Sequence, residues 1–228
     1  MFNIDKAMCR LIIFQRNEIL TNFQKKVRKL FGRYLFTQFF SYFNNLNYVS
    51  SRYYEISQKE YDEIKSHIKN DNFSLLSIGG GLGGVESIIL SQNKNIKVDI
   101  IEKNFVSSKI KYFWNPLEAY NKLNLTKKFL INNSRYNTNF QVFNFENKEN
   151  FKKKYDVIIS LFSMDYHYDL EIYKDFLNKN SHKDTIYIFD TIRAQELNNF
   201  FQKVKIINII DKRIHSSSRV VCSGLKNI

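Results

Sequence analysis

The sequence lacks any long uncharged apolar segment. None of its runs approaches the ~18 residues of apolar sequence that a membrane-spanning helix needs. Charged residues, among them Asp5, Arg10 and Glu18, also interrupt the first twenty positions, where a signal peptide would have an unbroken apolar core. We therefore expect neither a membrane span nor a signal peptide.

Cysteine is scarce, with only Cys9 and Cys222 in 228 residues. Two distant cysteines make neither a disulfide framework nor a metal site, and they are typical of a protein of the reducing cytoplasm. Internal repeats and low-complexity linkers are absent too. A chain of this length that is 43% hydrophobic suits one α/β domain with an extension.

Acidic residues are outnumbered by basic ones, 22 to 35, which gives a net charge of +13. One interpretation is an anionic partner, such as RNA, a membrane surface or a phosphorylated metabolite. The other is that lysines only decorate the solvated surface, because the basic residues are spread over the whole chain. The densest group lies on the polar side of a predicted helix, and we interpret it as a solvated face rather than an RNA site. It consists of Lys25, Lys26, Arg28, Lys29 and Arg33.

The N-terminal part of the chain shows helical periodicity. Apolar residues recur at helical spacing over residues 5–31, Gly32 is a plausible break, and residues 34–43 predict a second, aromatic helix. Ser57 and Glu60 have the spacing of a capping box, which predicts a helix from about residue 58 to 69. About seventy residues of helix are therefore expected to form a lid or a dimer surface.

Glycine is rare, but five of the seven glycines lie between Gly79 and Gly84. An apolar run precedes them and a helix-forming run follows, so the stretch predicts a buried strand, a tight turn and a helix N-terminus. Glycine permits left-handed backbone angles and close approach of a ligand, and the helix N-terminus presents unpaired N–H groups. A nucleotide-like ligand is the leading hypothesis for this turn.

After the turn, strand-like runs alternate with helical ones, which predicts a parallel sheet with helices on both faces. Only residues 211–218 separate the last two strands, too few for a crossover helix, so these strands should pair antiparallel. The expected strands after the turn are 96–102, 139–144, 155–161, 185–190, 204–210 and 219–225. The expected helices are 85–92, 104–113, 116–123, 170–178 and 193–201.

Two fingerprints overlap in the turn. Gly79-x-Gly81-x-x-Gly84 fits dinucleotide binding, and Gly79-x-Gly81-x-Gly83 fits S-adenosylmethionine binding equally well. Glu102 ends the next strand, 23 residues after Gly79, where an ionised acid can accept hydrogen bonds from both ribose hydroxyls. The alternative for Glu102 is an ordinary solvated carboxylate at a strand end.

These motifs, with the alternating strands, resemble the class I S-adenosylmethionine-dependent methyltransferases over residues 73–225. The resemblance implies an α/β, Rossmann-like, doubly wound seven-stranded sheet, mostly parallel with an antiparallel last strand, preceded by an N-terminal helical extension. It divides the chain into an extension, 1–70, and a cofactor domain, 71–228. A nicotinamide-dependent oxidoreductase would need a further substrate domain, for which the chain has no room.

The resemblance implies S-adenosyl-L-methionine as cofactor and S-adenosyl-L-homocysteine as product. Ser77 occupies the position where the family usually has an acid, so the contact to the cofactor's amino-acid part departs from the pattern. Near the end of the third strand, the adenine contact falls on Phe145 or Glu146, neither of which matches the usual Asp. The cofactor-binding residues carried over are Ser77, Gly79, Gly80, Gly81, Gly83, Glu102, Asn144, Glu146 and Ser160.

Residues 155–168 resemble the family's fourth-strand motif, whose polar tail emerges at the edge of the sheet where ligands bind. With residues 112–116 and 119–121, this tail also resembles bacterial sugar O-methyltransferases. His167 is the candidate base that removes the acceptor's hydroxyl proton, and Asp165 would orient it or act instead. The alternative is that His167 only packs the loop. Tyr166 and Tyr168 are expected to line the pocket.

Three cationic or titratable residues follow the fifth and sixth strands. Arg193, Arg213 and His215 could clamp a phosphorylated or nucleotide-linked substrate through charge-assisted hydrogen bonds. The alternative is that they are turn and surface residues. All three are expected on the ligand edge of the sheet.

The sequence thus predicts a cytoplasmic methyltransferase that acts on a small-molecule or glycan-precursor acceptor, most naturally at oxygen, and that belongs to surface glycan biosynthesis. An RNA methyltransferase is the alternative that the charge supports, although no RNA-binding module or Asn-Pro-Pro-Tyr-like tetrapeptide is present. A cofactor-binding regulatory protein without turnover is the third alternative. A homodimer is compatible with each.

Overall fold

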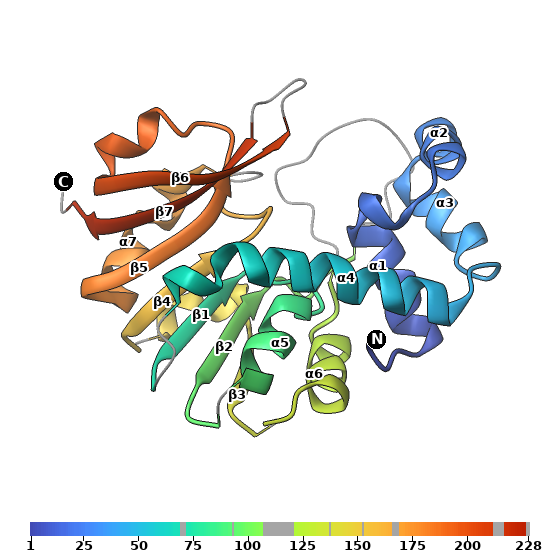
Figure 1. The fold of residues 1–228 in the computed structure, drawn as a ribbon, viewed down its shortest axis with the longest axis horizontal. Coiled ribbons are helices and arrows are strands. Elements are labelled where there is room, and N and C mark those ends of the chain that lie inside the picture. The colour runs from blue at the N-terminus through green and yellow to red at the C-terminus, as the bar shows by residue number, and fades with distance from the viewer. Residues whose placement is uncertain are drawn as a thin grey trace.

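A computed structural model describes residues 1–68, 72–92, 94–106, 121–136, 138–151, 153–165, 169–211 and 217–226. A seven-stranded sheet forms the centre of the molecule, with helices on both faces and further N-terminal helices packed beside it (Figure 1). The strand order is β3-β2-β1-β4-β5-β7-β6. The predicted Rossmann-like class is confirmed.

The strands follow the predicted positions closely. β1 pairs in parallel with both β2 and β4, and the chain reverses its direction of winding between β1 and β4. β7 runs antiparallel between β5 and β6, as the short connection predicted. The strands are β1 Ser74–Ile78, β2 Lys97–Glu102, β3 Phe140–Asn144, β4 Tyr155–Ser160, β5 Ser181–Thr191, β6 Phe201–Asp211 and β7 Ser217–Leu225.

The two faces of the sheet belong to two separate apolar clusters. Leu75 of β1 packs with the helices on one face, whereas the next residue, Leu76, packs with those on the other. Because successive side chains of a strand point to opposite faces, a strand buried on both faces must be apolar throughout. This explains the continuous apolar runs of β1 and β4.

The N-terminal helices differ from the prediction. The helix expected over residues 5–31 is two helices, because α1 ends before Arg16 and Thr21 then caps a new helix in a capping box with Gln24. Gly32 does separate α2 from α3, with a φ of 78°. The bounds are α1 Lys6–Gln15, α2 Asn22–Phe31 and α3 Arg33–Phe40.

The capping box predicted at Ser57 is wrong. Helix α4 runs without a break from Leu46 to Ile64, and its N-cap is Asn45. Ser57 lies buried inside it, and Glu60 binds Arg16 rather than the Ser57 backbone. The Ser-x-x-Glu spacing occurs here within a longer amphipathic helix whose buried face already begins at Val49.

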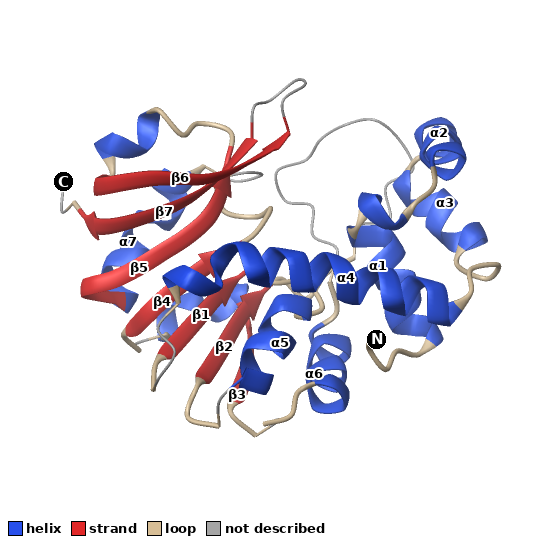
Figure 2. Cartoon of the chain, viewed as in Figure 1, coloured by secondary structure: helices blue, strands red, loops and turns tan. Residues whose placement is uncertain are grey.

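In the part of the chain that the structure describes, the α-helices after the glycine turn are α5, α6 and α7, and α6 was not predicted. α5 Gly84–Gln92 and α6 Leu123–Asn133 cover the same face as α4, and α7 Lys174–Asn180 lies on the other (Figures 1 and 2). The expected helices over 104–113 and 116–123 fall mainly on residues 107–120, outside the described residues. The helix expected over 193–201 is only a 3₁₀ turn, Glu196–Asn199, because β6 begins at Phe201.

Candidate functional site

The glycine turn joins β1 to α5 as predicted. Gly79, Gly81 and Gly83 have φ values of 72°, 61° and 88°, in the left-handed region that side chains disfavour. A Cβ on Gly79 would lie 2.1 Å from Ser163 Oγ, and one on Gly80 would lie 2.6 Å from Glu86 Oε1. The turn therefore needs glycine for both its angles and its close contacts.

Glu102 stands beside this turn, at the end of β2. Its Oε2 accepts a hydrogen bond from the Gly81 N–H at 3.0 Å, and its Oε1 accepts one from the Lys103 N–H at 3.0 Å. Burial raises the pKa of Glu102, although both N–H donors oppose the shift. The sequence thus identified an acid that the fold brings next to the glycines.

The end of β3 lies next to Glu102. Asn144 is the register partner of Glu102 across the β2–β3 pair. Its amide exchanges hydrogen bonds with Glu146, accepting from the Glu146 N–H at 3.2 Å and donating to the Glu146 carboxylate at 3.1 Å. Both residues lie on the same edge of the sheet as the glycine turn.

Ser77 pairs with an acid that sequence reasoning missed. Its hydroxyl donates to Oε1 of Glu86, which lies in the first turn of α5 and is only 3% exposed. Burial raises the pKa of Glu86 to about 7, while the Ser77 hydroxyl acts in the opposite direction. A carboxyl group therefore lies next to the position where the family has its acid. Acids are common in first helical turns, so nothing in the local sequence marks Glu86 as a partner of Ser77.

Helix α4 holds the start of α5. The Tyr53 hydroxyl accepts a hydrogen bond from the Gly84 N–H at 3.1 Å, and burial raises the pKa of this tyrosine. On the other side, Asn121 and Thr126 both donate to the Gly81 carbonyl at 2.8 Å. The glycine turn is thus fixed by side chains that come from α4 and from the region of α6.

The residues after β4 form a second group at this edge. Ser160 donates to the Ile78 carbonyl and accepts from the Met164 N–H, both at 2.8 Å, which ties β4 to β1. Asp165, which has a φ of 58°, binds the Arg193 guanidinium at 2.6 Å and accepts from the Thr191 hydroxyl. Burial raises its pKa although both partners lower it.

Arg193 joins two acids. It makes an ion pair with Asp169 at 3.0 Å in addition to the one with Asp165. The fold therefore brings Asp165 and Arg193, two of the predicted site residues, into direct contact. The other predicted residues of this region, Tyr166, His167, Tyr168, Arg213 and His215, lie outside the described residues.

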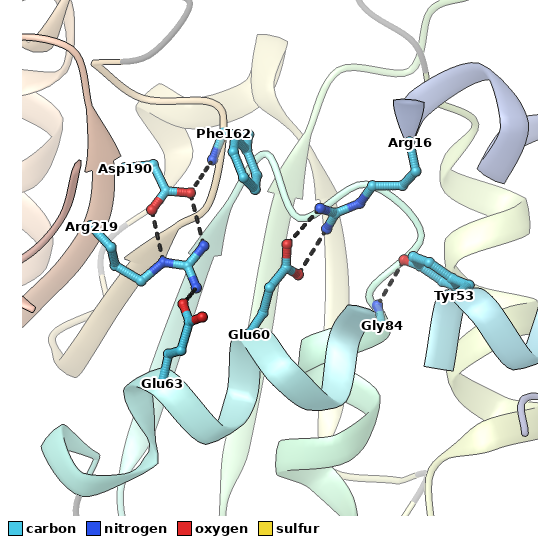
Figure 3. Close-up of polar contacts among 8 residues, drawn as sticks. All are labelled: Arg16, Tyr53, Glu60, Glu63, Gly84, Phe162, Asp190 and Arg219. Atoms are coloured by element: carbon cyan, nitrogen blue, oxygen red, sulfur yellow. Dashed lines mark hydrogen bonds and ion pairs between the residues drawn. The ribbon is translucent and has the colours of Figure 1, made fainter. Parts of the chain in front are cut away.

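A buried ion-pair network that sequence reasoning also missed links α4 to the sheet (Figure 3). Arg219 of β7 is 1% exposed and binds Asp190 of β5 through two nitrogens, at 2.8 and 3.0 Å. Its third nitrogen binds Glu63 of α4 at 2.7 Å. Nearby, Arg16 binds Glu60 of α4 at 2.6 Å. These partners are far apart in sequence, so no local pattern reveals them.

The aromatic ring of Phe162 lies between the two arginines of this network. The Arg16 and Arg219 guanidinium carbons are 5.6 and 6.0 Å from the ring centre, within cation–π range. Phe162 has a φ of 60°, and its N–H donates to Asp190 at 3.2 Å. The loop after β4 is therefore held in a strained conformation by the network.

A cavity of about 840 Å³ lies between the N-terminal helices and the residues that follow β2. Residues of α1 and α3, including Phe14 and Tyr34, line one side, and Asn104 and Phe105, just after β2, line another. Among the described residues, no group of three or more His, Cys, Asp or Glu side chains could hold a metal ion. Within the same residues, no helix has the length and apolar character to cross a membrane.

Comparisons with known proteins support the fold. No family model matches the sequence, and no curated protein matches it. A candidate O-methyltransferase from Nostoc punctiforme PCC 73102 has a similar structure, with a TM-score of 0.51 at 9% identity, over 76% of this chain and 61% of that one. PigF with SAH gives a TM-score of 0.50 at 13% identity, over 75% and 56%.

The chain thus spans about three fifths of the length of these two proteins. At such low identity the likeness concerns the fold. The sheet order, the glycine turn and the two structural neighbours together show the Rossmann-like fold of the class I methyltransferases, as the sequence predicted.

Proposed function

We propose that the protein is an S-adenosylmethionine-dependent methyltransferase that acts on a small-molecule acceptor. The main support is the placement of Glu102, which ends β2 and contacts Gly81 at the point where the strand order reverses. In open α/β sheets, ligands bind at this reversal, outside the carboxyl ends of the strands. An acid at this position suits the paired hydroxyls of a ribose.

The surroundings of the turn fit the rest of the cofactor. The backbone of Gly79, Gly80, Gly81 and Gly83 would lie against it without side chains in the way. Asn144 and Glu146, next to Glu102 in the sheet, would contact the base, and Ser160 would contribute from the end of β4. The Ser77–Glu86 pair would take the place of the family's acid. An ammonium group close to Glu86 would favour its ionised form.

When bound, S-adenosyl-L-methionine would supply a methyl group that leaves its sulfur as the bond to the acceptor oxygen forms, with S-adenosyl-L-homocysteine as the product. We assign to His167 the role of the base that would take the acceptor's hydroxyl proton. Asp165 would position this region, because Arg193 and Thr191 hold its carboxylate in place. The acceptor would occupy the cavity beside α1 and α3.

Basic and titratable residues that follow β5 and β6 in the sequence support an anionic acceptor. Arg213 and His215 would favour a phosphorylated or nucleotide-linked glycan precursor, and Arg193, which pairs with Asp165 and Asp169, would contribute only if the acceptor displaced one of these acids. Tyr166 and Tyr168 would line its apolar part.

Calorimetric titration with S-adenosyl-L-methionine and S-adenosyl-L-homocysteine tests the proposal. Glu102→Ala should weaken binding of both by more than tenfold. Asp184→Ala is the matched control, because Asp184 is an exposed acid near the start of β5, at the opposite edge of the sheet. Equal affinity in Glu102→Ala and the wild type would refute this placement. Binding of a nicotinamide dinucleotide in place of both compounds would refute the function.

A further inference from the structure

Helix α2 turns its apolar side chains to solvent. Phe23 and Leu30 are 71% and 76% exposed, and Phe31 is 57% exposed. With the half-buried Val27, they follow the spacing that gathers side chains on one face of a helix. A surface helix normally buries such a face against the protein core. Here most of it points away from the core.

A polar residue fixes this orientation. Arg28 of α2 is only 8% exposed, and its guanidinium donates to the carbonyls of Ile13 and Phe14 at 3.3 and 3.2 Å. These carbonyls belong to the last turn of α1, where a helix leaves its acceptors unsatisfied and has its negative dipole end. Arg28 therefore docks α2 by its polar side, and the solvated role expected for Arg28 is wrong.

The adjoining segment adds more exposed apolar side chains. Phe39 of α3 is 65% exposed, and Tyr42 and Phe43 just after it are 78% and 86% exposed. α2 and α3 lie together at the end of the molecule farthest from β5–β7 (Figures 1 and 2). We call the six exposed side chains the outer helical face: Phe23, Leu30, Phe31, Phe39, Tyr42 and Phe43.

The outer helical face exposes more apolar area than is usual for a surface that contacts only solvent. Phe23, Leu30 and Phe31, which share one face of α2, expose on the order of 400 Å², and the three side chains of the adjoining segment add a comparable area. The largest apolar patch of a typical monomer is roughly 300–600 Å². Such a face indicates a binding surface rather than scattered surface residues.

The segment that carries this face has charges of one sign. From Ile19 to Tyr54 the chain carries six basic residues and no acidic one. Lys25, Lys26 and Lys29 of α2 are exposed. In a symmetric dimer the same patch meets itself, so these lysines would approach like charges. A negatively charged partner would avoid this repulsion between lysines. The exposed phenylalanine and leucine side chains favour a partner that also has an apolar interior in which they can be buried.

We propose that the outer helical face docks on an anionic membrane surface. Its aromatic and leucine side chains would enter the boundary between headgroups and acyl chains, while the lysines contact the lipid phosphates, as in other interfacial amphipathic helices. The protein would lie on the bilayer without crossing it. This inference concerns α2 and α3 and is independent of the proposed reaction.

Flotation with phospholipid vesicles tests the inference on the full-length protein. Wild type should bind vesicles that contain phosphatidylglycerol, bind less at high salt, and fail to bind pure phosphatidylcholine. Phe23→Gln, Leu30→Gln and Phe31→Gln combined should reduce binding at least tenfold. Lys25→Gln with Lys26→Gln should reduce it about twenty-five-fold, at roughly fivefold per basic residue.

The matched control substitutes three exposed isoleucines elsewhere. Ile131, Ile172 and Ile206 are 54%, 62% and 52% exposed, and their replacement by glutamine should leave vesicle binding unchanged. Circular dichroism verifies that each variant is folded. Undiminished binding by the folded α2 apolar variant would overturn the inference. A dimer that this variant dissociates, with no vesicle binding by wild type, would assign the face to a second copy instead.

Discussion

Replacing Glu86 by glutamine should stabilise the protein in a pH-dependent way. The substitution keeps the shape of the side chain and an oxygen that can accept the Ser77 hydroxyl, but it removes the ability to ionise. Glu86 is 3% exposed, and its pKa is raised to about 7, chiefly by burial. Glu60 adds to the shift, whereas Ser77 and Arg16 oppose it.

The magnitude follows from linkage between protonation and folding. In the unfolded chain the Glu86 carboxyl ionises near 4.5, whereas the folded protein keeps the proton until about pH 7. The folded state therefore loses stability as the pH rises through this window, by about 3 kcal/mol once the group is ionised. The Glu86→Gln variant has no ionisable group at this position, so its stability does not fall for this reason as the pH rises. Glu86→Gln should equal wild type near pH 4.5 and be more stable by on the order of 3 kcal/mol at pH 8.

Urea unfolding at a series of pH values measures this difference directly. Asp184→Asn serves as the control, because Asp184 is exposed and its removal should change stability little at any pH. A stability gain for Glu86→Gln that is independent of pH, or a loss at pH 8, would refute the reasoning.

The same variant separates stability from function. If Glu86 binds the cofactor's amino-acid part, Glu86→Gln should bind S-adenosyl-L-methionine more weakly while the free protein becomes more stable. A general packing defect would weaken both, so opposite signs in the two measurements support a binding role.

Two further substitutions test the contacts that join α4 to the rest of the protein. Arg219→Met leaves the Asp190 carboxylate buried without its partner and should cost about 3–5 kcal/mol in urea unfolding. Adding Asp190→Asn should recover much of this loss, and a cost below about 1 kcal/mol would contradict a buried ion pair. Tyr53→Phe removes the acceptor of the Gly84 N–H and should destabilise by about 1–3 kcal/mol. In hydrogen-exchange measurements that amide should then exchange faster, and unchanged protection would contradict the contact.

The sequence predicted those parts of the fold that local patterns encode. Alternating strands and helices gave the sheet, and the short connection between the last two strands gave their antiparallel pairing. The glycine turn and its contact with an acid at the end of the next strand could be predicted because both are indicated by particular residues at a particular spacing, while the cofactor-binding role of Glu102 stays a prediction. In the structure the turn and this acid are in contact, because the Gly81 N–H donates a hydrogen bond to the Glu102 carboxylate.

The rest depends on contacts between residues far apart in the sequence. The capping box at Ser57 failed because Glu60 binds Arg16, 44 positions away. Helix α6 was missed because its polar composition hides an apolar side that includes Phe129 and Leu130, which only the packed fold reveals. The Ser77–Glu86 contact was not predicted for a related reason. Neither residue, at its own position in the sequence, indicates that it binds the other.

Helix α4 is attached to the sheet and to the glycine turn by separate contacts. It contacts the glycine turn through Tyr53, and it contacts β7, in the antiparallel part of the sheet, through the Glu63–Arg219 ion pair. Moving α4 away from the sheet would expose the apolar cluster that it shares with α5 and would leave the Arg219–Asp190 pair without its third partner. Such a motion is costly, because both apolar burial and buried charge pairing would be lost together. Of the described N-terminal helices, α4 is therefore expected to stay in place more firmly than α2 and α3.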